Sequence, residues 1–190
     1  MRKNHVQSLV MGLTILALTG CGTTKQATVE PSTVVTEPQV IDTVTVAVEA
    51  NTEFVSIEEA VRMLQSPSEK ATIMKKYGYK YKKGYEVSRM DKYDEMYYKN
   101  CKLPRMLREG VYENYPQPLV KGISSYVAFT DRIEIVVFNM NAYNNLVAQV
   151  KACGFHLVEE GYETAYSNGA CDIYCYEGGK RVRIQKAQSE

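Results

Sequence analysis

The chain has 190 residues, and its 23 lysines and arginines nearly balance its 22 aspartates and glutamates. This length suits one domain with a tail, or two small domains. A net charge of +1 lacks the sequence-wide positive field of a nucleic-acid-binding protein, so we expect no nucleic-acid partner.

The first residues combine a basic start with a short apolar run. Arg2 and Lys3 precede residues 9–18, which are mostly apolar. That run is about half of the ~20 residues that a membrane-spanning helix needs. A basic start, a short apolar region and an end of small residues are typical of a secretory signal peptide rather than of a membrane span.

The end of this segment is more specific than an ordinary cleavage site. Leu18, Thr19, Gly20 and Cys21 resemble the lipobox of bacterial lipoproteins. The resemblance covers only the first 21 residues. It implies that residues 1–20 are a signal peptide that is removed, and that Cys21 becomes the lipidated N-terminus.

The implied lipid sets an expected location for the protein. Two or three acyl chains on Cys21 would anchor the chain stably, since each buried methylene contributes about 0.8 kcal/mol. In Gram-negative lipoproteins an aspartate after the cysteine favours the inner membrane. Gly22 stands there instead, which favours the outer membrane. A plain secreted protein whose cysteine falls near the cleavage site is the alternative.

Residues 21–40 are expected to be a disordered tether between the lipid and the domain. They are rich in threonine and valine, have no helical period, and contain Pro31 and Pro38, which favour extended backbone. The alternating residues 40–50 leave open a first strand at this point. We place the folded domain at residues 41–190.

The domain is expected to open with two short helices. Ser56 and Glu59 form a capping box, and apolar residues follow at helical spacing. Pro67 interrupts the pattern, and Gly78 is a typical stop for the second helix. A further helix is expected near residues 141–154, with Asn141 as its cap.

Strand patterns fill most of the remaining chain. They cover residues 79–87, 94–103, 155–166 and two expected hairpins, around Thr130–Asp131 and Gly178–Gly179. Residues 104–122 are long for a loop and are expected to carry function or to cover an edge. The pattern predicts an α+β fold in which helices pack on an antiparallel sheet.

Two segments of the chain share a pattern. Residues 76–86 and 151–163 each end a helix at glycine, start a strand with an aromatic residue and reach Gly-Tyr-Glu, and Met96 and Ile173 follow at equal distances. Two arrangements therefore stay open: a single domain, or tandem helix-plus-sheet repeats over about 41–110 and 120–190.

The cysteines also leave two alternatives. Cys101, Cys153, Cys171 and Cys175 follow the lipobox, and an even number in an exported chain allows two disulfides. Cys171 and Cys175 would lie about 13 Å apart along a strand, too far to pair with each other. Buried free thiols are the other possibility.

The sequence contains no recognisable catalytic or metal-binding motif. His156 is the only histidine after the signal peptide, and Cys153 is the only cysteine near it. Cys153 falls on an apolar helical stripe, which favours a packing role over nucleophilic catalysis. A zinc site would need a second pair of ligands. We therefore predict no catalytic residue, no metal site and no cofactor.

One unusual stretch alternates tyrosine with lysine. If it is a strand, Tyr79 and Tyr81 share one face, and Lys80 and Lys82 share the other. These four residues are the candidate binding residues, because tyrosine offers a flat contact and lysine offers charge. The alternative is a half-buried strand with its tyrosines inward and its lysines outward.

These features predict a lipid-anchored protein of the cell envelope that acts as a binding module. It would meet the membrane through its lipid and bind a protein or an envelope glycan. The second hypothesis is an envelope hydrolase that acts on a cell-wall or glycan substrate. An exposed aromatic patch would favour binding, whereas paired carboxylates or His156 in a cleft would favour hydrolysis.

Overall fold

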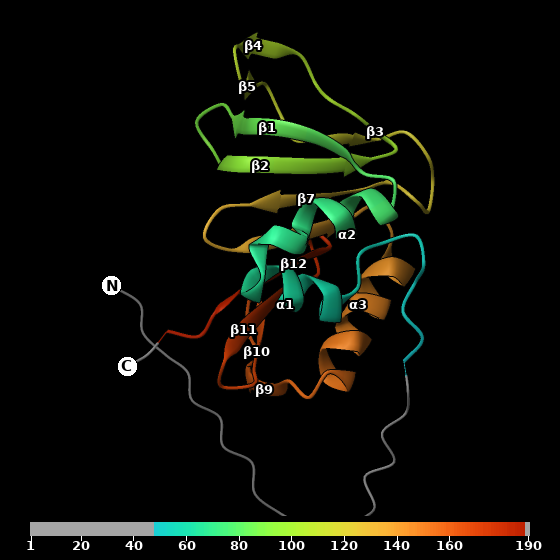
Figure 1. Ribbon diagram of the computed structural model, residues 1–190, viewed down its shortest axis with the longest axis vertical. Coiled ribbons are helices and arrows are strands. Elements are labelled where there is room, and N and C mark those ends of the chain that lie inside the picture. Colours follow the sequence, from blue (N-terminus) through green and yellow to red (C-terminus); the bar gives the residue numbers. More distant parts are fainter. Residues whose placement is uncertain (1–47, 189–190) are drawn as a thin grey trace, which may run out of the picture. The chain divides into compact units, whose positions relative to one another are not determined.

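The computed structural model describes residues 48–188 (Figure 1). Cys21, the tether and most of the expected first strand lie outside the described residues. Both expected early helices are present, as α1 (Ile57–Gln65) and α2 (Lys70–Lys76), joined by the 3-10 turn η1 (Pro67–Glu69). The predicted cap of α1 is confirmed, since the Ser56 hydroxyl oxygen accepts a hydrogen bond from the Glu59 backbone N–H at 3.2 Å.

Helix α3 (Met140–Ala152) is capped two residues earlier than predicted. The side chain of Asn139, not Asn141, accepts the hydrogen bond from the Ala142 backbone N–H, at 2.8 Å. Both asparagines suit a cap chemically. Asn139 holds the position because its backbone is extended, whereas Asn141 already lies in the first helical turn.

Within residues 48–188, ten strands form one sheet in the order β4-β5-β1-β2-β7-β8-β12-β11-β10-β9. All neighbours pair antiparallel except β1 and β5. Both predicted hairpins are confirmed, as β7–β8 and β11–β12. The strands of this sheet are β1 (Lys80–Val87), β2 (Lys92–Lys99), β4 (Met106–Arg108), β5 (Val111–Tyr112), β7 (Ser125–Phe129), β8 (Ile133–Val137), β9 (His156–Glu159), β10 (Thr164–Ser167), β11 (Cys171–Tyr176) and β12 (Arg181–Lys186).

The three α-helices of the described part of the chain share one face of the sheet (Figure 1). Apolar side chains of α1, α2 and α3, such as Met63, Met74 and Leu146, pack against sheet residues that include Val127 and Ile135. Alternate residues along each central strand point to this core. The sheet dominates the fold, and the helices cover only one side of it.

The opposite face has a second, smaller core. Tyr112, with the partly buried Leu103 and Tyr115, packs on sheet residues that include Met96 and Tyr126. The stretch 104–122 therefore covers this face, and it also extends the sheet edge through β4 and β5. The short strands β3 (Cys101–Lys102) and β6 (Gln117–Pro118) pair with each other and so bring the start and the end of this stretch together.

The described residues contain no tandem repeat, so the duplicated arrangement is wrong. The two Gly-Tyr-Glu segments differ in structure: Tyr85 is 1% exposed inside β1, whereas Tyr162 is 79% exposed between β9 and β10. Met96 and Ile173 belong to cores on opposite faces of the sheet. The shared pattern arises because both α2 and α3 end at a left-handed glycine before a strand.

The four cysteines of the described region are free thiols. Cys101, Cys171 and Cys175 are buried, and Cys153 is exposed after α3. Burial raises the pKa of Cys101 to about 11 and that of Cys175 to about 12. The free-thiol alternative therefore holds, and the buried thiols are poor nucleophiles because the thiolate is the reactive form.

Alkylation should report this difference directly. Without denaturant, we expect iodoacetamide to modify Cys153 while it leaves Cys101, Cys171 and Cys175 untouched. In urea without reductant all four should react, because no disulfide has to be opened. Peptide mapping by mass spectrometry measures each site. A cysteine that reacts in urea only after a reductant is added would contradict the prediction.

Candidate functional site

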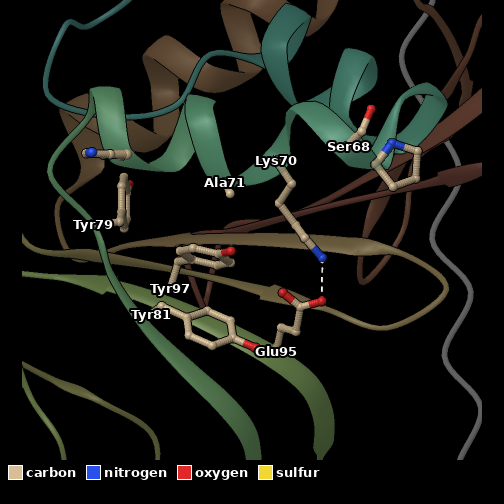
Figure 2. A pocket seen from close by; sticks show the side chains of 9 residues that line it. Ser68, Lys70, Ala71, Tyr79, Tyr81, Glu95 and Tyr97 are labelled. Carbon is tan, nitrogen blue, oxygen red and sulfur yellow. Dashed lines mark hydrogen bonds and ion pairs between the residues drawn. The ribbon is translucent and has the colours of Figure 1, made fainter.

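An open groove lies between α2 and the strands β1 and β2 (Figure 2). Its volume is about 470 Å³, which is within the range of small binding sites. We call it the α2 groove. It is lined by Pro67, Ser68, Lys70, Ala71, Lys75, Tyr79, Tyr81, Glu95 and Tyr97.

The turn at Gly78 brings the predicted tyrosines under the helix. Gly78 has a φ of +76°, and it sends the chain from α2 directly into β1. Tyr79 and Tyr81 both line the α2 groove. Lys82 lies on the opposite side of the strand, with its Nζ 5.8 Å from the centroid of the Tyr112 ring. Lys80 is two residues away from Lys82 along the strand and therefore lies on the same side as Lys82. The structure thus places the two tyrosines in the groove and the two lysines outside it.

Tyr79 belongs to the core beneath the groove. Only 8% of the residue is exposed, and its hydroxyl shares a 2.6 Å hydrogen bond with the Ser125 hydroxyl. Burial raises the pKa of Tyr79 well above its ordinary value, since the phenolate would lose its hydration. For Tyr79 the inward-facing alternative is therefore correct.

Tyr81 is different, because 52% of it is exposed. Its ring leans on the ring of Tyr97, with centroids 5.1 Å apart and planes 55° apart. The Tyr97 ring in turn meets Phe129 edge-on, at 5.6 Å. Tyr81 is thus an exposed aromatic contact that rests on a buried aromatic base, as Figure 2 shows for the two tyrosines.

An ion pair crosses one end of the groove. Lys70 Nζ lies 2.5 Å from Glu95 Oε1, drawn as the dashed line in Figure 2. Lys70 Nζ also lies 4.8 Å from the centroid of the Phe129 ring, and this cation–π contact stabilises the lysine side chain in the ion pair. Because both charges are matched, neither gives the groove a free charge.

Lys75 supplies the free charge of the groove. Its side chain is exposed, and the ion pairs formed within residues 48–188 do not include it. The groove therefore offers one unpaired cation beside the aromatic surface of Tyr81 and Tyr97. This combination favours a partner that carries an apolar group next to an acidic one.

A second hollow of about 260 Å³ adjoins the groove. It shares Pro67, Lys70 and Glu95 with the α2 groove, so the two lie on either side of the Lys70–Glu95 ion pair. Its own lining includes Asp131 and Arg132. The adjoining hollows suit an extended partner segment better than a compact small molecule.

Sequence reasoning missed most of this lining. Lys70, Glu95 and Tyr97 lie on α2 and β2, away from the tyrosine–lysine alternation. Tyr81 and Tyr97 are register partners across β1 and β2, and only the strand pairing brings them together. The tyrosine-rich composition of β2 indicated a strand, but it does not show which face Tyr97 is on or which strand lies beside β1.

The residues considered for catalysis do not form a reactive site. His156 lies on the exposed edge strand β9. Partial desolvation of the Cys153 thiol, followed by repulsion from Glu58, raises its pKa although the residue is exposed, and this is the wrong direction for an activated nucleophile. Within residues 48–188 no group of three or more histidines, cysteines, aspartates and glutamates could hold a metal ion.

Comparisons with models of protein families, with curated proteins and with solved structures found no match. Among the helices of the described region, none has the length and apolar character to cross a membrane.

Proposed function

We propose that this chain is a lipid-anchored protein of the cell envelope whose domain binds a partner protein through the α2 groove. The observation that carries this proposal is Tyr81, a half-exposed aromatic ring on a rigid base beside the unpaired Lys75. Tyrosine is among the residues that dominate protein interfaces, and an unpaired charge beside it selects a partner of opposite charge.

The chemistry of the groove defines the partner segment. An apolar or aromatic side chain would pack on Tyr81, and a neighbouring carboxylate would pair with Lys75. The segment would continue past the Lys70–Glu95 ion pair into the second hollow. Such a segment needs no deep cavity, because contact with an aromatic platform excludes water around a few central residues.

The lipid anchor is the other part of the proposal. It rests on the lipobox-like residues that end at Cys21, and on Gly22 for the outer membrane. A lipid would hold the domain near a membrane, which raises the local concentration of an envelope partner. The hydrolase hypothesis receives no support from His156 or Cys153 as they are placed.

Substituting Cys21 by serine should abolish lipidation. We expect the wild-type chain to lose residues 1–20 and to gain two or three acyl chains, and we expect the C21S variant to gain none. Intact mass spectrometry of the detergent-extracted protein measures both. A wild-type mass without acyl chains would remove the anchor from the proposal and leave the groove untouched.

Site-specific photo-crosslinking tests the groove. A benzophenone amino acid replaces Tyr81 in the full chain, which is irradiated in its own envelope. We expect a protein adduct that becomes several-fold weaker with Lys75→Glu and stays unchanged with Lys75→Arg. The matched control carries the same amino acid at Leu119, which is also exposed.

Three outcomes would contradict the proposal. One is the absence of a protein adduct at position 81, and another is an equally strong adduct at position 119. The third is an adduct whose yield is the same in the Lys75→Glu variant as with the native lysine. An adduct with a glycan instead of a protein would assign the groove to a different class of partner.

A further inference from the structure

Another pocket lies on the face of the sheet that the helices leave uncovered. Its volume is about 450 Å³, close to that of the α2 groove. We call it the tyrosine pocket. Its lining includes aromatic side chains from separate parts of the chain: Tyr115, Tyr126, Phe138, Tyr162 and Tyr176.

The aromatic rings form two stacked pairs. Tyr162 stacks on Tyr176, with centroids 4.6 Å apart and planes 30° apart. Tyr115 lies nearly parallel to Tyr126, at 6.5 Å and 11°. Tyr162 is 79% exposed, which is unusual for a ring that is already stacked. Its outer face is free for a ligand.

The glycine pair after β11 holds one of these rings in place. A Cβ atom at Gly179 would lie 2.8 Å from Cδ1 of Tyr176, and one at Gly178 would lie 2.8 Å from the Tyr176 hydroxyl. Neither glycine has a left-handed backbone. The Tyr176 ring can lie this close to the backbone because neither residue has a side chain. The glycines thus hold the ring as well as forming the turn that the sequence predicts.

The charges around the pocket form one ion-pair network, in which three arginines share the carboxylates of Glu134 and Glu163. Arg181 lines the pocket, and its guanidinium lies 3.7 Å from the Glu134 carboxylate and 3.2 Å from that of Glu163. Arg183 pairs with Glu163, and Arg132 pairs with Glu134. An anionic ligand would lose hydration beside arginines that already have carboxylate partners, and a cationic ligand would be repelled by them. The pocket therefore suits an uncharged ligand.

The rim adds hydrogen-bonding groups to the aromatic walls. Asn114 and Gln117 contribute amide side chains, and the tyrosines contribute hydroxyl groups. Amides and hydroxyls both donate and accept hydrogen bonds. A ligand with one apolar face and many hydroxyl groups would use the walls and the rim together. A plain aromatic molecule would use only the walls.

We propose that the tyrosine pocket binds a sugar ring of an uncharged glycan. The C–H face of the sugar would lie on Tyr162, and its hydroxyl groups would bond to the rim amides and to tyrosine hydroxyls. This site is on the other face of the sheet from the α2 groove, so it does not depend on the partner protein proposed above.

Titration with neutral oligosaccharides tests the proposal. The probes are three neutral trisaccharides: the trimer of N-acetylglucosamine, cellotriose and maltotriose. Saturation-transfer and chemical-shift NMR measure their binding to the full mature chain. We expect at least one probe to bind at millimolar concentration. Tyr162→Ala should weaken it about tenfold or more, because one stacking face is lost.

Two further variants test whether sugar binding depends on the tyrosine pocket rather than on the α2 groove. Tyr81→Ala removes the exposed tyrosine of the other face, and it should leave sugar binding unchanged. Gly179→Ala keeps every aromatic residue but displaces the Tyr176 ring, so it should weaken sugar binding as well. Tyr162 is exposed, so its removal should leave the thermal midpoint unchanged.

The proposal is overturned if none of the three sugars binds at millimolar concentration. It is also overturned if a sugar binds equally well to the Tyr162→Ala variant, or if Tyr81→Ala abolishes binding. p-Cresol serves as an aromatic probe. If it binds in a Tyr162-dependent way while no sugar does, the pocket accepts aromatic side chains and the glycan assignment is wrong.

Discussion

Replacing Tyr79 by alanine is expected to lower the free energy of unfolding by about 3–5 kcal/mol. Tyr79 is nearly fully buried in the core that α1, α2 and α3 form with the sheet. Its loss leaves a cavity and also leaves the Ser125 hydroxyl without its partner at 2.6 Å. Tyr79→Phe loses only that hydrogen bond, and it should cost about 1 kcal/mol.

Tyr81→Ala is the matched control, since it removes the neighbouring groove tyrosine. Half of Tyr81 is exposed, so this change should alter the free energy of unfolding by less than about 1 kcal/mol. Urea denaturation followed by circular dichroism measures all three variants. If Tyr81→Ala proved as destabilising as Tyr79→Ala, the division of the groove into core and contact surface would be wrong.

Replacing Glu134 by alanine should also destabilise the domain, by about 3–5 kcal/mol. The Glu134 carboxylate is buried and accepts hydrogen bonds from Arg132 Nε at 3.0 Å and from the Tyr93 hydroxyl at 3.2 Å. Arg181 lies 3.7 Å from it. Removing the carboxylate takes the nearer acceptor from the buried Tyr93 hydroxyl. It also takes a counter-charge from Arg132 and Arg181, which are only partly exposed to water.

Glu113→Ala provides the comparison for this charge network. Glu113 pairs with Arg105 at 3.2 Å, but both side chains are exposed, so the expected loss is below about 1 kcal/mol. Thermal and urea unfolding of the two variants give the difference. Equal losses for Glu134→Ala and Glu113→Ala would show that the buried network does not stabilise the sheet.

Local signals predicted the helices and hairpins well. The Ser56–Glu59 capping box and the break at Pro67 define α1 and its end within a few residues of sequence. The hairpins at Thr130–Asp131 and Gly178–Gly179 are also short-range features. Each of these depends on residues that are close in the chain.

Long-range pairing could not be predicted in the same way. The strands β4 and β5 form within the proline-bearing stretch only because the edge of β1 is available to them. The tandem repeat was a false inference from two similar helix ends. A shared sequence pattern does not show whether its residues face the same core, and Met96 and Ile173 do not.

The α2 groove was predicted only in part, for a reason that lies in β1. A strict two-residue period would place Tyr81 and Tyr85 on one face. Tyr81 lines the groove, whereas Tyr85 belongs to the opposite core. Between them Gly84 has a left-handed backbone, with a φ of +63°, and the alternation changes there. The sequence shows the glycine but not its conformation.

Native tyrosine nitration, mapped by mass spectrometry on purified protein and on intact envelopes, tests binding at the α2 groove most directly. In purified protein we expect Tyr81 and Tyr162 to react and the buried Tyr79 and Tyr85 to stay unmodified. In envelopes the partner should protect Tyr81. Equal nitration of Tyr81 in both samples would contradict a bound partner, and nitration of Tyr79 would contradict the fold around the groove.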